Sequence, residues 1–215
     1  MASTAFDYKV WRQRPVLLHL ESVFRRVCAY CECSYVSGYP AVEHYRPKSK
    51  LKDDPDGHQG YYWLAYTDRN YRLACTPCNT NKSSKFPVAG KRAITPADSL
   101  DGEDPLLLDP CETADPDAHL LFDERGNTTG LTEAGRRTIT ELKLNRDDLK
   151  RERLDAWRYF RDSINLAILA SDPKRVTLPA APTYLGVRRA VVREMRRVSV
   201  SPQFFEQLLD LLNQL

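Results

Sequence analysis

Long apolar runs are absent from this chain of 215 residues, and none approaches the ~20 residues that a membrane-spanning helix requires. The first residues, MASTAFDYKVWRQR, lack the apolar core of a secretory signal, so we expect a cytoplasmic location. The formal net charge is only +3, too small to indicate a polyanionic partner, so the positions of the basic residues matter more. Hydrophobic residues make up 42% of the chain and charged residues 28%, which is typical of a globular protein with one core, or with a small module and an extension.

The six cysteines are few but unevenly placed. Four of them form two pairs with two intervening residues, Cys28 with Cys31 and Cys75 with Cys78. Because a disulfide framework is not expected in a reducing compartment, two such pairs indicate a structural zinc site with four thiolate ligands. The alternative is a set of reduced cysteines in a small core. Cys33 could replace Cys31 as a ligand, and the pattern gives Cys111 no role.

The pattern of apolar residues predicts an α+β protein. The helices predicted from apolar spacing and helix-start signals cover residues 15–26, 76–84, 132–142, 146–170, 183–198 and 202–215. The strands predicted from aromatic and β-branched content cover residues 39–45, 106–108 and 119–122. Residues 51–60 form a polar loop, and residues 87–104 form an irregular connector. We expect a zinc-stabilised module over residues 1–90 and a mainly helical extension over residues 91–215.

The C-terminal extension has two features that allow alternative interpretations. Five arginines give one helix a basic surface, which is either a solvated face or a nucleic-acid contact: Arg188, Arg189, Arg193, Arg196 and Arg197. Residues 204–212 (FFEQLLDLL) form an apolar stripe that suits a core. If that stripe is exposed, it is a candidate surface for docking a partner.

Polar residues between and after the cysteine pairs form a recognisable set. Glu43 and His44 follow the first pair, Asn70 precedes the second, and the second pair continues as Cys78-Asn79-Thr-Asn-Lys82. This pattern resembles the HNH nucleases, whose treble-clef-like ββα-metal module ends in a C-x2-C-(His/Asn)-x2-Lys motif. The resemblance implies that His44 is the general base and that Asn70 braces the histidine loop. It also implies that Glu43 and Asn79 bind a catalytic Mg²⁺ or Mn²⁺.

These residue types suit phosphodiester hydrolysis. A neutral imidazole with a pKa of about 6.5 can accept the proton of an attacking water, and a hard divalent ion with oxygen ligands can offset charge on the phosphate. Adjacent residues on a strand point to opposite faces, so Glu43 and His44 serve one site only if the backbone is twisted there. The alternative for Glu43 is an ion pair with Arg46 or Lys48, and Asn70 could be a plain turn residue.

Basic residues flank this set and are candidates for contacting substrate phosphates. They are Arg46, Lys48, Lys82 and Lys85. Contacts of this type position a nucleic-acid strand without reading its sequence. The alternative for each lysine is a solvated surface charge, except that Lys82 occupies a fixed position of the HNH motif. His58, in a Pro-Asp-Gly-His loop, is expected to be a packing or turn residue.

Further segments resemble one branch of the HNH proteins, the PtuB-like proteins of Septu-type and retron-associated antiphage systems. These segments are EHYRPK at 43–48, HQGYYWLAY at 58–66, KFP at 85–87, LLDP at 107–110 and LNR at 144–146. The resemblance implies a nuclease held by a PtuA-like ATPase partner, which would dock on the helical region, with DNA favoured over RNA as substrate. An RNA- or tRNA-cleaving effector is the alternative within the fold. A zinc-knuckle module that binds nucleic acid or protein without cutting is the alternative outside it.

Overall fold

The computed structural model describes residues 6–7, 9–34, 40–170, 172, 175–176, 183–197 and 202–213. The helices are α1 (Arg14–Val23), α2 (Thr76–Lys82), α3 (Glu133–Leu142), α4 (Asp147–Leu169), α5 (Leu185–Arg196) and α6 (Pro202–Asn213). The strands are β1 (Ala41–His44), β2 (Tyr71–Ala74), β3 (Leu120–Phe122) and β4 (Thr128–Gly130). Three short 3-10 helices are η1 (Tyr62–Leu64), η2 (Asp68–Asn70) and η3 (Pro116–Ala118).

The N-terminal half is built on an antiparallel pair of strands followed by a helix. β1 pairs with β2, with Glu43 opposite Arg72 and His44 opposite Tyr71. α2 begins directly after β2, and a proline in its first turn suits a helix start because no N–H is needed there. The order β1–β2–α2 therefore places the end of β1 beside the second cysteine pair.

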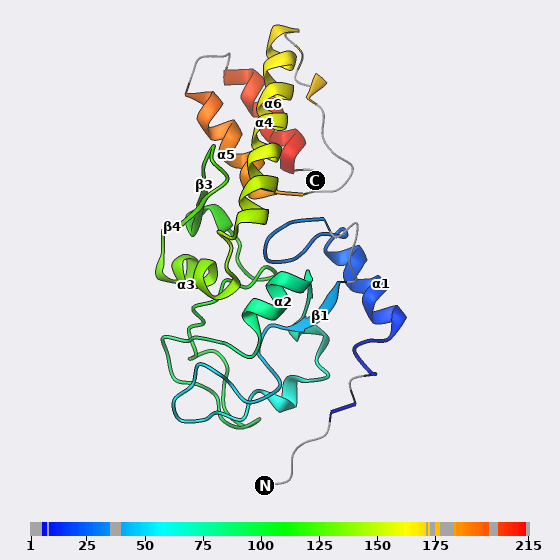
Figure 1. Ribbon diagram of the computed structural model, residues 1–215, viewed down its shortest axis with the longest axis vertical. Helices are drawn as coiled ribbons and strands as arrows, with labels where there is room; N and C mark the ends of the chain where they lie inside the picture. Colours follow the sequence, from blue (N-terminus) through cyan, green and yellow to red (C-terminus); the bar gives the residue numbers. More distant parts are fainter. Residues whose placement is uncertain are drawn as a thin grey trace.

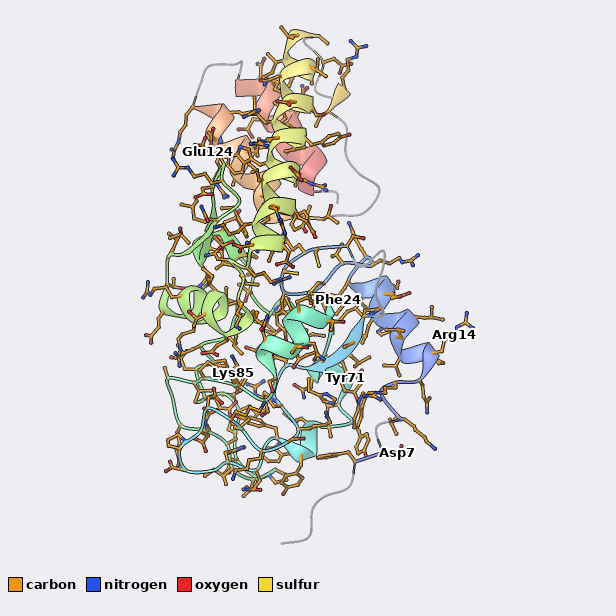
Figure 2. The ribbon with its side chains drawn as sticks, in the orientation of Figure 1. Asp7, Arg14, Phe24, Tyr71, Lys85 and Glu124 are labelled. Atoms are coloured by element: carbon orange, nitrogen blue, oxygen red, sulfur yellow. The ribbon has the colours of Figure 1, made fainter. Side chains whose placement is uncertain are left out.

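Helix α1 covers the strand pair from outside. Leu20 of α1 packs in a small buried cluster with Trp11, Tyr71 and Leu73, and Phe24 packs against this cluster. Figure 2 labels Phe24 just after α1 and Tyr71 at the start of β2, and it shows Arg14 on the side of α1 that faces away from the strands. This packing fixes the N-terminal segment next to β1 and β2.

The C-terminal half is mainly helical. β3 and β4 form a hairpin whose turn contains Gly126 at a φ of 78°, a conformation that glycine adopts without strain. Thr132 caps α3 by accepting a hydrogen bond from the Gly135 N–H. α4, α5 and α6 pack together at one end of the long axis of the molecule, with β1 and α2 nearer the other end (Figure 1).

One continuous buried cluster links the two halves. It runs from Cys28 through Phe86 and Leu144 to Val187 and Leu208. The chain therefore has no break in its hydrophobic core near residue 90, and the independence of the two predicted parts stays a prediction. No helix among the described residues is both long and apolar enough to cross a membrane.

Most predicted elements agree with the structure, but the strands differ. All six predicted helices are present, with ends shifted by up to three residues, and the strand at 39–45 corresponds to β1 in its described part. The strand predicted at 106–108 is wrong. The strand predicted at 119–122 corresponds to β3, which pairs with β4 because a tight turn at Asp123–Asn127 brings the next residues back.

The C-terminal helices use their charges and apolar residues internally. Arg189 and Arg193 of α5 both pair with Asp117, at 2.8 and 2.6 Å, and Arg188 is buried. Phe204 and Leu208 of α6 are buried in the core, so the predicted docking stripe is covered at these positions. The expected basic surface of α5 is thus largely a set of intramolecular ion pairs.

Candidate active site and metal centre

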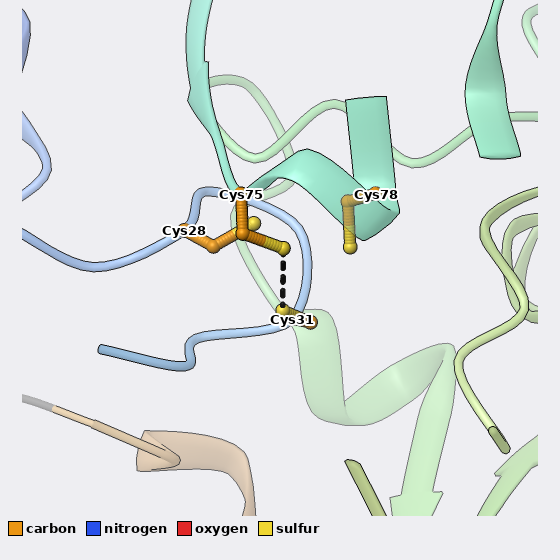
Figure 3. Close-up of side chains that lie close together, drawn as sticks. All are labelled: Cys28, Cys31, Cys75 and Cys78. Carbon is orange, nitrogen blue, oxygen red and sulfur yellow. Dashed lines mark hydrogen bonds between the residues drawn. The ribbon is translucent and has the colours of Figure 1, made fainter. Parts of the chain in front are cut away.

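The four paired cysteines meet in one buried cluster. The Sγ atoms of Cys28, Cys31, Cys75 and Cys78 all lie within 4.8 Å of one another (Figure 3). The Cys31 and Cys75 sulfurs are 3.7 Å apart, close to the separation of about 3.8 Å expected of sulfurs bound tetrahedrally at ~2.3 Å from zinc. Four buried thiolates repel one another, so only a cation can keep all four deprotonated. The cluster could hold a zinc ion, and the predicted grouping is confirmed.

The two remaining cysteines lie outside this group. The Cys33 Sγ is 3.3 Å from that of Cys31, but the group of four sulfurs that lie within 4.8 Å of one another contains Cys31 and not Cys33. The arrangement therefore favours Cys31 over Cys33 as the fourth ligand. Cys111 is exposed and is not part of the cluster.

A cleft of about 700 Å³ opens at the end of β1 beside α2. Four of the predicted site residues line it: Glu43, His44, Lys48 and Asn79. The structure adds residues that the sequence did not single out, among them Trp11, Arg12, Lys52, Thr80, Ser83 and Ser84. Three cationic side chains, from Arg12, Lys48 and Lys52, therefore line one cleft together with the His44 imidazole and the Asn79 amide.

His44 is held in one orientation and one tautomer. Its Nε2 atom lies 2.9 Å from the Ala65 carbonyl oxygen, which can only accept a hydrogen bond, so Nε2 carries the proton and Nδ1 has a free lone pair. The rings of Trp11 and Tyr71 pack edge-on against the imidazole, at 4.9 and 5.1 Å between centroids. Burial, assisted by the nearby Lys48 charge, lowers the pKa of His44 to about 4. The imidazole is therefore neutral at physiological pH.

Asn70 braces the segment that follows His44. Its Oδ1 accepts a hydrogen bond from the Arg46 N–H at 2.8 Å, and its Nδ2 donates to the Arg46 carbonyl at 2.9 Å. The same Nδ2 is 3.3 Å from the carbonyl of Leu64, the residue before the His44 acceptor. Asn70 thus joins the segment that follows His44 to the loop that orients its ring, and its part in the reaction stays a prediction.

Glu43 and Lys82 form a buried ion pair, which departs from both predicted roles. The Lys82 Nζ lies 2.7 Å from Glu43 Oε1 and 2.9 Å from the His44 carbonyl oxygen, and Tyr30 donates its hydroxyl proton to Glu43 Oε2 at 2.7 Å. Burial raises the pKa of Glu43, and Lys82 opposes that rise. Both Glu43 oxygens already accept a hydrogen bond, so a metal ion at Glu43 would compete with Lys82 and Tyr30 for this carboxylate. Lys82 is fully buried and cannot reach a substrate phosphate.

The expected phosphate contacts of Arg46 and Lys85 also change. Arg46 Nε pairs with buried Glu103 at 2.7 Å, and Lys85 pairs with Glu141 of α3 at 2.6 Å. Neither residue lines the cleft. Figure 2 shows Lys85 on the α3 side of α2, whereas Tyr71 lies on the side of α1. Both residues are better described as links between the N-terminal half and the chain that follows it.

The residues that line the cleft include two lysines and an asparagine, which are Lys48, Lys52 and Asn79. The Lys48 ammonium lies 4.8 Å from the centroid of the Trp11 ring, and the Lys52 Nζ donates to the Ser83 hydroxyl at 2.8 Å. Asn79 stands in the first turns of α2 and lines the cleft with its neighbour Thr80. Of the four predicted phosphate contacts, Lys48 is the one that lines the cleft, and its contact with a phosphate stays a prediction.

His58 has the packing role that its loop indicates. Its Nε2 lies 2.8 Å from the Ala93 carbonyl oxygen, and its Nδ1 accepts a hydrogen bond from the Gly60 N–H at 3.0 Å. Both ring nitrogens are therefore engaged, whereas His44 keeps Nδ1 available. The two buried histidines form a matched pair for experiments.

The Glu43–Lys82 pair gives a stability prediction. We expect Lys82→Met to lower the free energy of unfolding by about 3–5 kcal/mol, because it leaves a buried carboxylate without its partner. The double variant Glu43→Gln with Lys82→Met should lower the free energy of unfolding by clearly less. Urea unfolding of both proteins measures the difference, and an unchanged midpoint for Lys82→Met would show that the pair does not contribute as described.

Comparison with known proteins finds similarity to two Septu proteins from Bacillus mycoides (strain KBAB4). The chain is 34% identical to Septu protein PtuB in an alignment 163 positions long that covers 70% of this chain and 53% of PtuB. It is 27% identical to Septu protein PtuA in an alignment 205 positions long that covers 90% of this chain and 28% of PtuA. The chain thus spans about half the length of one relative and about a quarter of the other. No protein-family model and no solved structure matches it.

Proposed function

We propose that this protein is an endonuclease that hydrolyses phosphodiester bonds of nucleic acid as part of a Septu-type antiphage system. The observation that carries the proposal is His44, a neutral imidazole with a fixed tautomer and an available Nδ1, in a cleft lined by Asn79 and three cations. The similarity to PtuB and PtuA supports the assignment to antiphage defence. The order β1–β2–α2 agrees with the ββα arrangement that the HNH motif implies.

In this proposal His44 acts as the general base. Its Nδ1 takes a proton from a water molecule, the water oxygen attacks phosphorus, and the bond to the leaving 3′ oxygen breaks. Lys48 and Lys52 hold the phosphate and offset the charge that builds on it. Asn70 and the Ala65 carbonyl keep the imidazole in place during the transfer.

The cleft residues do not complete the expected Mg²⁺ or Mn²⁺ site. Glu43 is engaged by Lys82 and Tyr30, so Asn79 is the predicted oxygen ligand that stays open. Hard divalent ions prefer several oxygen ligands, and one amide does not supply them. Metal dependence is therefore measured directly, by comparing cleavage in Mg²⁺, in Mn²⁺ and in EDTA.

The cations that line the cleft also suit a second candidate, a zinc-knuckle module that binds nucleic acid without cutting it. Such a module needs the cations of the cleft but has no use for an oriented neutral histidine. Incubation with supercoiled plasmid and with structured RNA, in Mg²⁺, Mn²⁺ or EDTA, separates the two candidates. We expect cleavage by the chain together with its PtuA-type partner. Binding with both substrates left intact in every condition would support the second candidate instead.

The cleft cations give a binding prediction. Lys48→Gln with Lys52→Gln should weaken nucleic-acid binding and reduce the slope of log affinity against log salt by about 2, since each lysine that neutralises a phosphate releases about one counterion. Fluorescence anisotropy at several salt concentrations measures this slope. Arg161→Gln is the control, because Arg161 is exposed on α4 and pairs with Asp162. Equal slopes for the double variant and the wild type would exclude this cleft as the phosphate contact.

A further inference from the structure

Arg146 reaches the cysteine cluster from the first residue before α4. Its Nη1 lies 3.8 Å from the Cys78 sulfur, and its Nη2 lies 3.8 Å from the Cys31 sulfur. One guanidinium therefore donates to one cysteine of each C-x2-C pair. Figure 1 shows the N-terminal end of α4 approaching α2, the helix that carries Cys78.

The residues around Arg146 hold it rigidly. Leu144 is buried in the core, and its carbonyl accepts a hydrogen bond from buried Arg153 at 2.6 Å. Asn145 bonds both backbone groups of Thr128, its Oδ1 accepting from the N–H and its Nδ2 donating to the carbonyl, each at 2.8 Å. The sequence Leu144-Asn145-Arg146 thus anchors the start of α4 twice before the arginine side chain reaches the sulfurs.

The charge of the cysteine cluster gives a physical reason for the contact with Arg146. Four thiolates around one Zn²⁺ carry a net charge of −2, which is costly in a buried site unless cations or hydrogen-bond donors lie close. Arg146 supplies both, with a side chain that is 15% exposed. It does not serve as a conventional helix cap, because its side chain makes no capping hydrogen bond to α4.

We propose that Arg146 is a positioning residue for the zinc site, which neutralises the thiolate cluster and ties the two cysteine pairs together. Zinc retention then depends on the helical half of the chain, not only on the module that contains the cysteines. This inference rests on the cysteine cluster and is independent of the proposed nuclease activity.

Zinc release tests the inference. The full chain, loaded with zinc, is mixed with an excess of the chelating dye 4-(2-pyridylazo)resorcinol, and the release rate is compared between variants. We expect Arg146→Gln to release zinc about tenfold faster or more, in line with the usual effect of removing a hydrogen bond to a metal ligand. Arg146→Lys, which keeps the charge but loses the two-point contact, should be intermediate. Arg161→Gln on the same helix should match the wild type.

A spectroscopic measurement separates this role from a general loss of stability. In the cobalt-substituted protein, donors to the sulfurs raise the energy of the thiolate-to-cobalt charge-transfer band. We expect Arg146→Gln to shift this band to longer wavelength, while a variant that only destabilises the fold, such as Lys82→Met, leaves it in place. Release within twofold of the wild type together with an unshifted band would overturn the inference. If Arg146→Gln fails to fold, the same two measurements on Arg146→Lys decide.

Discussion

We expect His44→Gln to lower the rate of phosphodiester cleavage by about 10²–10⁴-fold, because the variant loses the group that accepts the proton of the attacking water. Glutamine can still donate a hydrogen bond to the Ala65 carbonyl, so the fold around the cleft should be retained. The rate is measured under single-turnover conditions, which separates chemistry from product release. Nucleic-acid affinity, measured by anisotropy, should change little.

The matched control is His58→Gln. His58 is buried and bonded to a backbone carbonyl, like His44, but its second nitrogen is used by the Gly60 N–H. This variant should lose stability and keep its cleavage rate at temperatures where it is folded. If both histidine variants lose activity in proportion to stability, His44 is a core residue and not the base.

The same histidine should make stability depend on pH. The pKa of His44 is about 4 in the folded protein and about 6.5 in an unfolded chain, so the unfolded state binds more protons between these values. Its contribution to stability is therefore full above pH 6.5 and is lost as pH falls toward 4. Comparing wild type with His44→Gln by urea unfolding isolates this contribution.

The second large effect concerns zinc. We expect Cys75→Ser to lose bound zinc and to unfold the N-terminal half, since structural zinc contributes on the order of 10 kcal/mol to folding in small zinc-binding modules. Metal analysis of the purified protein and circular dichroism measure the two effects. The wild type should contain about one zinc per chain.

Two cysteine variants serve as controls for this result. Cys111→Ser should keep zinc and stability because Cys111 is exposed and is not one of the four grouped sulfurs. Cys33→Ser should also keep zinc, because Cys33 is not one of the four grouped sulfurs. A protein in which Cys33→Ser removes the metal and Cys31→Ser does not would reverse the assignment of the fourth ligand.

Local sequence patterns predicted the parts of the site that depend on short spacing. Two residues between cysteines place both sulfurs on one knuckle, and a proline at the start of α2 indicated where that helix begins. Asn70 was expected to brace the histidine segment, and it bonds the backbone of Arg46. The cysteine spacing and the helix start each depend on residues that lie close together in the sequence, so local patterns are enough to predict them.

Long-range charge pairs could not be predicted in the same way. Lys82 meets Glu43 only because α2 folds back over β1, and Arg146 meets the cysteines only because α4 begins beside α2. The sequence does not predict β2, because its four residues include the charged Arg72. The charge of Arg72 is offset by Asp109, whose carboxylate lies 2.5 Å away although the two residues are far apart in the sequence. The sequence shows that these residues are charged, but only the tertiary structure shows which partner each of them meets.

The most direct test of the central claim is the conversion of supercoiled plasmid by the zinc-loaded chain mixed with the proposed partner, a PtuA-type protein. The account predicts that nicked or linear DNA accumulates with time for the wild type and for His58→Gln but not for His44→Gln. DNA and structured RNA that stay intact with all three proteins, in Mg²⁺, in Mn²⁺ and in EDTA, while zinc content and binding are normal, would contradict it.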